Sequence, residues 1–440
     1  IGNADLSAAF GFWAGAALPI GLALCLLLMG LFFAKRMRAA DVVTLPEYFR
    51  NRFGRSTEVA SSVLTIASFI ILLAGNLVAV GFLLERFLGV SYAFGILLTV
   101  PLALLYTITG GMFASVYTGV TCVVVNIVGV VSLVIWVAST HGFSAPEGMG
   151  AGDLSQLTSS GSGAVINWAT IIALGLGNLV AIDLMQRVFS ARTPGGAQKA
   201  CFAAAAGILM LCIPLSFVAL AAVSIVGDAA ADGPILYTLL GQYAPAWLAI
   251  VVISGLLAAT LTTISGILLS TAAVLIRNVL RIDADAVTMT PRVLTATRWA
   301  TLPMAVLAAV VALRVPQTGI LLTLAFDVLL ASLVVPFILG LYWSRGNAAA
   351  AWAAIVAGIA VRMTFFVLTP TIYGVDNTLL YIPNEWVGPA ADGWSTLLAG
   401  AVSLAAYLLV AAFTARPAAP AVQPAPQVAP APAVLTSAQP

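Results

Sequence analysis

Long apolar runs constrain this chain more than any other feature of its sequence. Eleven such runs, separated by short polar segments, cover residues 9–34, 59–83, 92–110, 114–138, 164–187, 199–226, 245–275, 294–313, 318–342, 348–368 and 394–414. About 20 mostly apolar residues are enough to cross a bilayer as an α-helix. Membrane β-strands would alternate apolar and polar residues, and residues 253–276 show no such alternation. The sequence therefore predicts an all-α integral membrane protein with eleven transmembrane helices.

The composition excludes several functions. Only 8% of the 440 residues are charged, against about 25% in a soluble domain, so a soluble enzyme is excluded and we expect no catalytic residues. The net charge of +2 provides no basic surface for a nucleic acid. The four cysteines lie in apolar runs without metal-ligand spacing, and His141 is the sole histidine. We therefore expect no disulfide framework, no metal site other than one for sodium, and no resident cofactor.

The basic residues indicate the orientation, because cytoplasmic loops are enriched in Lys and Arg. If the chain starts outside, the loops and helix ends on the inner side hold Lys35, Arg36, Arg38, Arg50, Arg52, Arg55, Arg187, Arg192, Lys199, Arg277, Arg281, Arg292, Arg298, Arg345 and Arg416. Only Arg86 and Arg314 fall outside, while Arg362 lies within the tenth run. We expect a multi-pass protein of the cell (inner) membrane, with its N-terminus outside and its C-terminus in the cytoplasm.

The chain divides into two parts. Residues 1–415 form the predicted transmembrane domain. Residues 416–440 are rich in Pro and Ala, which favour extended backbone and offer little to pack. We expect this segment to be a disordered cytoplasmic tail.

Glycines interrupt the fifth run at mid-membrane, in the order Gly175, Leu176, Gly177, Asn178. Glycine weakens a helix, and broken helices form the binding sites of many transporters because their ends present backbone groups to ligands. Small residues also allow close helix packing. One explanation is a broken helix with a substrate site at Gly175, Gly177 and Asn178, and the other is close helix packing. The local pattern favours neither.

A hydroxyl cluster lies in the seventh run, where Ala259 precedes Thr262 and Thr263. Two adjacent hydroxyls and a carbonyl could form part of a sodium cage. Threonines in membrane helices also commonly bond the carbonyl of residue i−4. Taken alone, the cluster favours this ordinary role.

The apolar runs contain charged residues, among them Asp183, Arg187, Asp327 and Arg362. Asp327, in the ninth run, is a candidate proton, cation or substrate contact because an unpaired acid there costs about 2.5–3.5 kcal/mol. A protonated or helix-paired structural acid is the alternative. Asp183 and Arg187 have the i,i+4 spacing of an ion pair. Arg362 is expected to extend toward the outer interface.

Four ordered motifs resemble those of the sodium:solute symporter family, which contains the proline, pantothenate and sugar symporters. TLPEYF at 44–49 with RFG at 52–54 looks like that family's cytoplasmic segment, and YTITGG at 106–111 is close to its YTxxGG turn. QRVFSAR at 186–192 and GLYWSR at 340–345 are similar to two further motifs. The resemblance extends across residues 20–370.

The resemblance implies two inverted repeats of five helices, with the substrate bound between two broken helices at mid-membrane. It makes the Gly175–Asn178 segment part of a broken helix. It also makes the seventh run the sodium-binding helix, with Thr262, Thr263 and the Ala259 carbonyl as ligands. The family's other broken helix is expected before Ile1, so this sequence should hold half of the site.

One motif departs from the family pattern. The segment after the YTxxGG turn usually reads T-D-x-x-Q, and here Gly119 and Cys122 replace the acid and the amide. Because the family's aspartate is associated with sodium handling, coupling here could be altered, proton-driven or lost. Asp327 could compensate as a proton carrier.

We therefore predict a cation-coupled symporter of a small organic solute, working by alternating access with Na⁺ as the first choice of ion and H⁺ as the second. A carboxylate or zwitterion is favoured as solute. A transporter-like solute sensor with degenerate coupling is the alternative. A passive channel is a third class, but no selectivity filter is evident.

Overall fold

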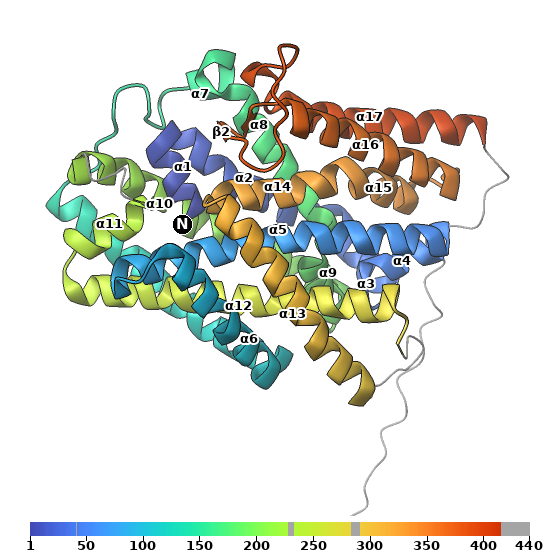
Figure 1. Cartoon of the computed structure of the whole chain (residues 1–440), viewed down its shortest axis with the longest axis horizontal. Coiled ribbons are helices and arrows are strands. Elements are labelled where there is room, and N and C mark those ends of the chain that lie inside the picture. Colours follow the sequence, from blue (N-terminus) through green and yellow to red (C-terminus); the bar gives the residue numbers. More distant parts are fainter. Residues whose placement is uncertain (41, 228–232, 283–290, 415–440) are drawn as a thin grey trace, which may run out of the picture.

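The chain folds into a bundle of helices, most of which run along the long axis of the molecule (Figure 1). The computed structural model describes residues 1–40, 42–227, 233–282 and 291–414, so the predicted tail lies outside the described residues. The first half contains α1 (Gly2–Phe10), α2 (Phe12–Leu28), η1 (Met29–Phe33), α3 (Ala34–Ala39), α4 (Leu45–Phe53), α5 (Arg55–Leu88), α6 (Tyr92–Thr140), α7 (Ser155–Thr158), η2 (Ser160–Ser162), α8 (Ala164–Ile172), η3 (Ala173–Gly177), η4 (Asn178–Val180) and α9 (Ile182–Ser190).

The second half has the same character. It contains α10 (Pro194–Val226), α11 (Ile235–Gln242), α12 (Ala246–Val274), η6 (Leu275–Val279), α13 (Pro291–Arg314), α14 (Thr318–Leu329), η7 (Leu330–Val334), α15 (Val335–Tyr342), α16 (Ala348–Leu368), η8 (Pro389–Ala391) and α17 (Trp394–Phe413). The strands β1 (Thr371–Ile372) and β2 (Val375–Asp376) form an antiparallel hairpin.

All eleven predicted runs are helical. In the described part of the chain, nine helices are long and apolar enough to cross a membrane, and a bent pair at Ala164–Val180 and Ile182–Ser190 makes a tenth. The remaining run, 92–110, corresponds to the shorter apolar helix Tyr92–Ile108. The protein is therefore a multi-pass membrane protein.

The two predicted spans within α6 do not form one straight helix. The hydroxyls of Tyr106 and Thr118 lie 2.6 Å apart, whereas twelve residues of straight helix would separate their backbones by about 18 Å. The helix is consequently bent between them, where the YTxxGG turn was predicted.

Capping residues explain why the motif segments begin helices. Thr44 Oγ1 accepts a hydrogen bond from the Glu47 N–H and Pro46 lies in the first turn of α4, while Glu47 Oε2 accepts one from the Val43 N–H. This is close to a capping box. Thr193 caps α10 in the same way, again with a proline in the first turn.

Burial separates central helices from peripheral ones. Of the most apolar window in the α14–α15 span, 78% is buried inside the protein, against 28% in α17. In a bilayer, an unburied apolar helix face is covered by lipid. The α14–α15 span is thus at the centre of the bundle, while α16 and α17 pack together at its edge (Figure 1).

Candidate functional site

The fifth run is broken, as predicted. Its helix α8 widens into the π-helical turn η3 at Ala173–Gly177, tightens into the 3₁₀ turn η4, and becomes extended at Ala181. The two halves meet at a bend of 49°. Backbone groups freed in this way need a partner at membrane depth, so the break is a place where a ligand can bind.

The two glycines of this break also pack closely against neighbouring helices. A Cβ on Gly175 would lie 2.8 Å from Leu24 Cδ2 of α2, and one on Gly177 would lie 2.0 Å from the Phe326 carbonyl oxygen of α14. Asn178 is half-buried at the end of the π-helical turn. Both explanations offered for the glycines therefore describe the structure, since the segment is broken and tightly packed.

The predicted sodium ligands of α12 converge on one point. The hydroxyls of Thr262 and Thr263 donate to the same Ala259 carbonyl oxygen, at 2.9 and 2.8 Å. These are also the ordinary local bonds of membrane threonines. Thr263 is exposed, and Ala259 and Thr262 are half-buried, so this group of hard oxygen atoms lies on a partly exposed face of α12. Such oxygens suit a small cation.

The segment that departs from the family pattern lies beside this oxygen group. Asn126 of α6 donates to the Cys122 carbonyl at 2.8 Å and to the Gly255 carbonyl of α12 at 3.0 Å. Gly255 precedes Ala259 by about one helical turn. Asn126 therefore links α6 to α12, and Cys122 is buried next to it.

Asp327 has a charged partner. Its carboxylate is fully buried and forms an ion pair with the Nε of Arg362 from α16. Arg362 is only 5% exposed, so the expectation that it extends to the outer interface is wrong. The pair agrees with the helix-paired structural role for Asp327, whose backbone neighbour Phe326 contacts Gly177.

Asp183 differs from the expected ion pair. Its Oδ1 is buried without a hydrogen-bond partner, while Arg187 is exposed. Within the described residues no ion pair joins them, because the first turn of α9 faces the interior and the last turn faces solvent.

A cavity of about 340 Å³ opens at the end of the bundle opposite the basic motifs. Its lining comes from α1, the loop before α8, α8, α14 and the β1–β2 hairpin, and includes Phe10, Ser162, Asn167, Thr170, Thr323 and Tyr373. All of these side chains are uncharged. Burial raises the pKa of Tyr373 well above its usual value, which keeps its hydroxyl neutral. Because α8 leads from Thr170 into η3, the cavity lies over the broken segment.

Sequence reasoning did not identify these cavity residues. Asn167 and Thr170 lie in the fifth run, but Tyr373 lies outside the apolar runs, in the turn of the hairpin. Tyr373 has φ of 50° and Gly374 of 85°, the left-handed conformations that a tight hairpin turn requires. The sequence signal that could have indicated this turn is the Tyr373-Gly374 pair between two short segments.

Three of the four motifs meet at one end of the bundle. Arg52 donates to the carbonyls of Gly340, Trp343 and Ser344 at 2.9 to 3.3 Å. Arg38 donates to the Ala191 carbonyl at 2.7 Å. The segments predicted to share the cytoplasmic side are therefore together.

Comparison with known proteins agrees with this architecture. The family model "Sodium:solute symporter family" matches residues 1–358. High-affinity choline transporter 1 of Caenorhabditis elegans is 24% identical over 376 residues, which cover 79% of this chain and 63% of that protein. Its namesake in Drosophila melanogaster is 24% identical over 364 residues, covering 79% of this chain and 58% of that protein. The chain thus spans less than two thirds of the length of these relatives.

A solved structure shares the fold. A Na⁺-coupled sialic acid symporter in its substrate-bound outward-open state superposes with a TM-score of 0.68 at 15% identity, covering 95% of this chain and 90% of that one. The predicted inverted-repeat transporter fold is therefore confirmed. Because the family model matches well over half of its length, the chain belongs to the sodium:solute symporter family.

Proposed function

We propose that this protein is a Na⁺-coupled symporter that moves a small organic solute by alternating access. The observation that carries the proposal is the convergence of Thr262 and Thr263 on the Ala259 carbonyl, on an accessible part of α12. Family membership and the broken α8–α9 segment support it. The proposal includes the coupling ion, the class of solute and the orientation in the membrane.

In this mechanism, Na⁺ binds the oxygens of Ala259, Thr262 and Thr263. The solute enters through the uncharged cavity and binds beside Gly177 and Asn178. Helix α12 contacts α9, the second half of the broken helix, so the ion-binding helix touches the continuation of the segment that would hold the solute. Na⁺ and solute should then tighten each other's binding by the same factor.

The cavity bears on the class of solute. Among its described lining residues no side chain is charged, so a bare carboxylate finds no cation there. A zwitterion fits better because it has no net charge. Choline, a cation, is nevertheless the first solute to test, because Phe10 and Tyr373 provide aromatic surface that attracts a quaternary ammonium and because the relatives named above are choline transporters. Protons remain the second choice of coupling ion, with Asp327 as their carrier.

The placement in the membrane is part of the proposal. We place the protein in the cell (inner) membrane with the cavity outside and the basic motif segments in the cytoplasm, since positive charge is retained on the inner side. Cysteine labelling of intact cells at residue 374, in the hairpin, and at residue 344, in the GLYWSR motif, tests this orientation. Labelling at residue 344 but not at residue 374 would show the opposite orientation.

Uptake into proteoliposomes tests the function. The full-length protein should accumulate radiolabelled choline or a zwitterion such as proline under an inward Na⁺ gradient, and an equal K⁺ gradient should not support accumulation. Thr263→Ala should raise the Na⁺ concentration for half-maximal uptake about tenfold or more, while Thr263→Ser keeps the ligand. Thr364→Ala is the matched control, because that exposed threonine makes the same 2.8 Å bond to residue i−4 in α16.

The sensor alternative predicts a different outcome. It rests on Gly119 and Cys122, which replace the family's acid and amide. Saturable solute binding without accumulation under either a Na⁺ or a proton gradient would favour the sensor. Accumulation driven only by a proton gradient, and lost in Asp327→Asn, would replace sodium with H⁺.

A further inference from the structure

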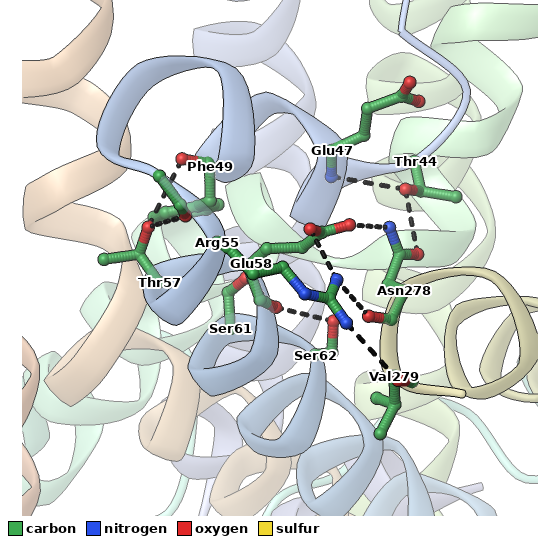
Figure 2. A network of polar contacts seen from close by, with 11 residues as sticks. Thr44, Glu47, Phe49, Arg55, Thr57, Glu58, Ser61, Ser62, Asn278 and Val279 are labelled. Carbon is green, nitrogen blue, oxygen red and sulfur yellow. Dashed lines mark hydrogen bonds and ion pairs between the residues drawn. The ribbon is translucent and has the colours of Figure 1, made fainter. Parts of the chain in front are cut away.

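A buried polar network holds the end of the ion-binding helix. Figure 2 shows the α4–α5 corner, with Thr44, Arg55 and Glu58, lying against the end of η6 at Asn278 and Val279. Glu58 is 1% exposed and Asn278 is 4% exposed. A buried carboxylate is costly unless it is paired and fully hydrogen-bonded, so the partners of Glu58 matter.

Both carboxylate oxygens of Glu58 have partners. Its Oε2 accepts from Arg55 Nη1 at 2.6 Å, and its Oε1 accepts from Asn278 Nδ2 at 2.8 Å. The other side-chain atom of the amide, Asn278 Oδ1, accepts from Thr44 Oγ1 at 3.1 Å. Every polar atom of these two side chains is therefore satisfied.

Arg55 also caps the helix end. It donates to the Asn278 carbonyl at 2.6 Å and to the Val279 carbonyl at 3.3 Å. The last carbonyls of a helix lack partners within it, and a cation there is favourable. The Glu58 carboxylate orients this guanidinium and also binds the Asn278 side chain. Glu58 therefore determines both the side-chain contact and the backbone contacts at the end of η6.

This helix end belongs to the helix of the oxygen group. Thr263 lies fifteen residues before Asn278, which corresponds to about 22 Å of helix. Between them the backbone is continuously helical, so a shift at Asn278 is transmitted along the helix to Thr263. Binding sites need their ligands held within about 0.5 Å.

We infer that Glu58, through Arg55 and Asn278, is a positioning residue that sets the Na⁺ affinity of the oxygen group on α12. The inference rests on the proposed sodium coupling. It goes further by assigning to the cytoplasmic α4–α5 corner a role in ion binding at a distance, without contact with the ion.

Glu58→Gln is the central variant. It removes the negative charge that holds Arg55 and, with Asn278 in its present orientation, places an amide N–H₂ against either Arg55 or Asn278, so that one donor faces another donor. Asn278→Asp creates the opposite fault by facing one carboxylate with another. The combination Glu58→Gln with Asn278→Asp restores one acid, one amide and every donor–acceptor pair. Glu85→Gln is the matched control, because Glu85 is an exposed glutamate at the other end of α5.

The measurement is the thermal stabilisation of the purified full-length protein by NaCl against equal KCl. Each single variant should raise the Na⁺ concentration for half the maximal shift about tenfold. The combined variant should return it to within about twofold, and Glu85→Gln should leave it unchanged. A purely structural role predicts a lower melting temperature in KCl with an unchanged Na⁺ midpoint, and that result would overturn the inference.

Two outcomes separate the inference from the proposed function. If the unmutated protein shows no Na⁺-specific stabilisation, sodium coupling fails and the inference fails with it. If the unmutated protein responds normally and the variants titrate like it, the inference alone is wrong. Should Glu58→Gln not fold, Asn278→Ala removes only neutral groups, and an unchanged Na⁺ midpoint in that variant overturns the inference.

Discussion

Replacing Gly177 with alanine tests the contact between the broken helix and α14. Gly177 has φ of −60° and ψ of −38°, a conformation that alanine adopts readily, so any cost is steric. The added Cβ would lie 2.0 Å from the Phe326 carbonyl oxygen, although real Cβ contacts essentially never fall below 3.0 Å. The α14 backbone or the broken segment must therefore move by at least 1 Å, the difference between these two distances.

The expected cost follows from this displacement. Overpacking typically costs about 1–3 kcal/mol, and a backbone carbonyl cannot rotate away as a side chain can, which favours the upper end. Alanine returns up to about 1 kcal/mol of helix propensity. We expect Gly177→Ala to lower stability by about 2 kcal/mol and to weaken solute binding about tenfold, since the break and Phe326 shift together.

Gly207→Ala is the matched control for this variant. Gly207 lies within α10, and a Cβ added to it would meet no other atom within 4 Å, so alanine should stabilise the helix slightly. Thermal unfolding and solute binding of the two purified variants are compared with the unmutated protein. Equal unfolding temperatures and equal solute affinities for both variants would refute the close-packing argument.

Two further predictions concern buried acids. Asp327→Asn leaves Arg362 buried without a counter-charge and should cost about 3–5 kcal/mol, whereas adding Arg362→Gln should recover most of this in thermal unfolding. Unchanged pH dependence of uptake in that double variant would exclude Asp327 as a proton carrier. Burial raises the pKa of Asp5 from 3.8 to about 6. Between these pH values the native state holds a proton on Asp5 that the unfolded state has lost, so stability should fall as pH rises. Asp5→Asn should flatten unfolding temperature over this interval; a slope equal to that of the unmutated protein would contradict the assignment.

The local sequence was sufficient to predict the membrane bundle, whereas the resemblance to the family was needed to select Ala259, Thr262 and Thr263 as an oxygen group. A run of about 20 apolar residues can satisfy its backbone in lipid only as a helix, so the eleven spans follow from composition along the chain. Ala259, Thr262 and Thr263 share one helix face because their spacing is i, i+3 and i+4. The glycine pattern at 175–178 favoured a break and close packing equally, and the structure shows both.

Tertiary structure alone decided which distant groups meet. Asp327 and Arg362 are 35 positions apart, and Glu58 and Asn278 are 220 apart. Helical periodicity specifies which face of a helix a residue occupies, but it does not specify which helix packs against that face. The sequence therefore placed Asp327 and Arg362 within apolar runs but did not identify Glu58, and the packing of η7 on α16 and of α5 on η6 determined the partners of these charges.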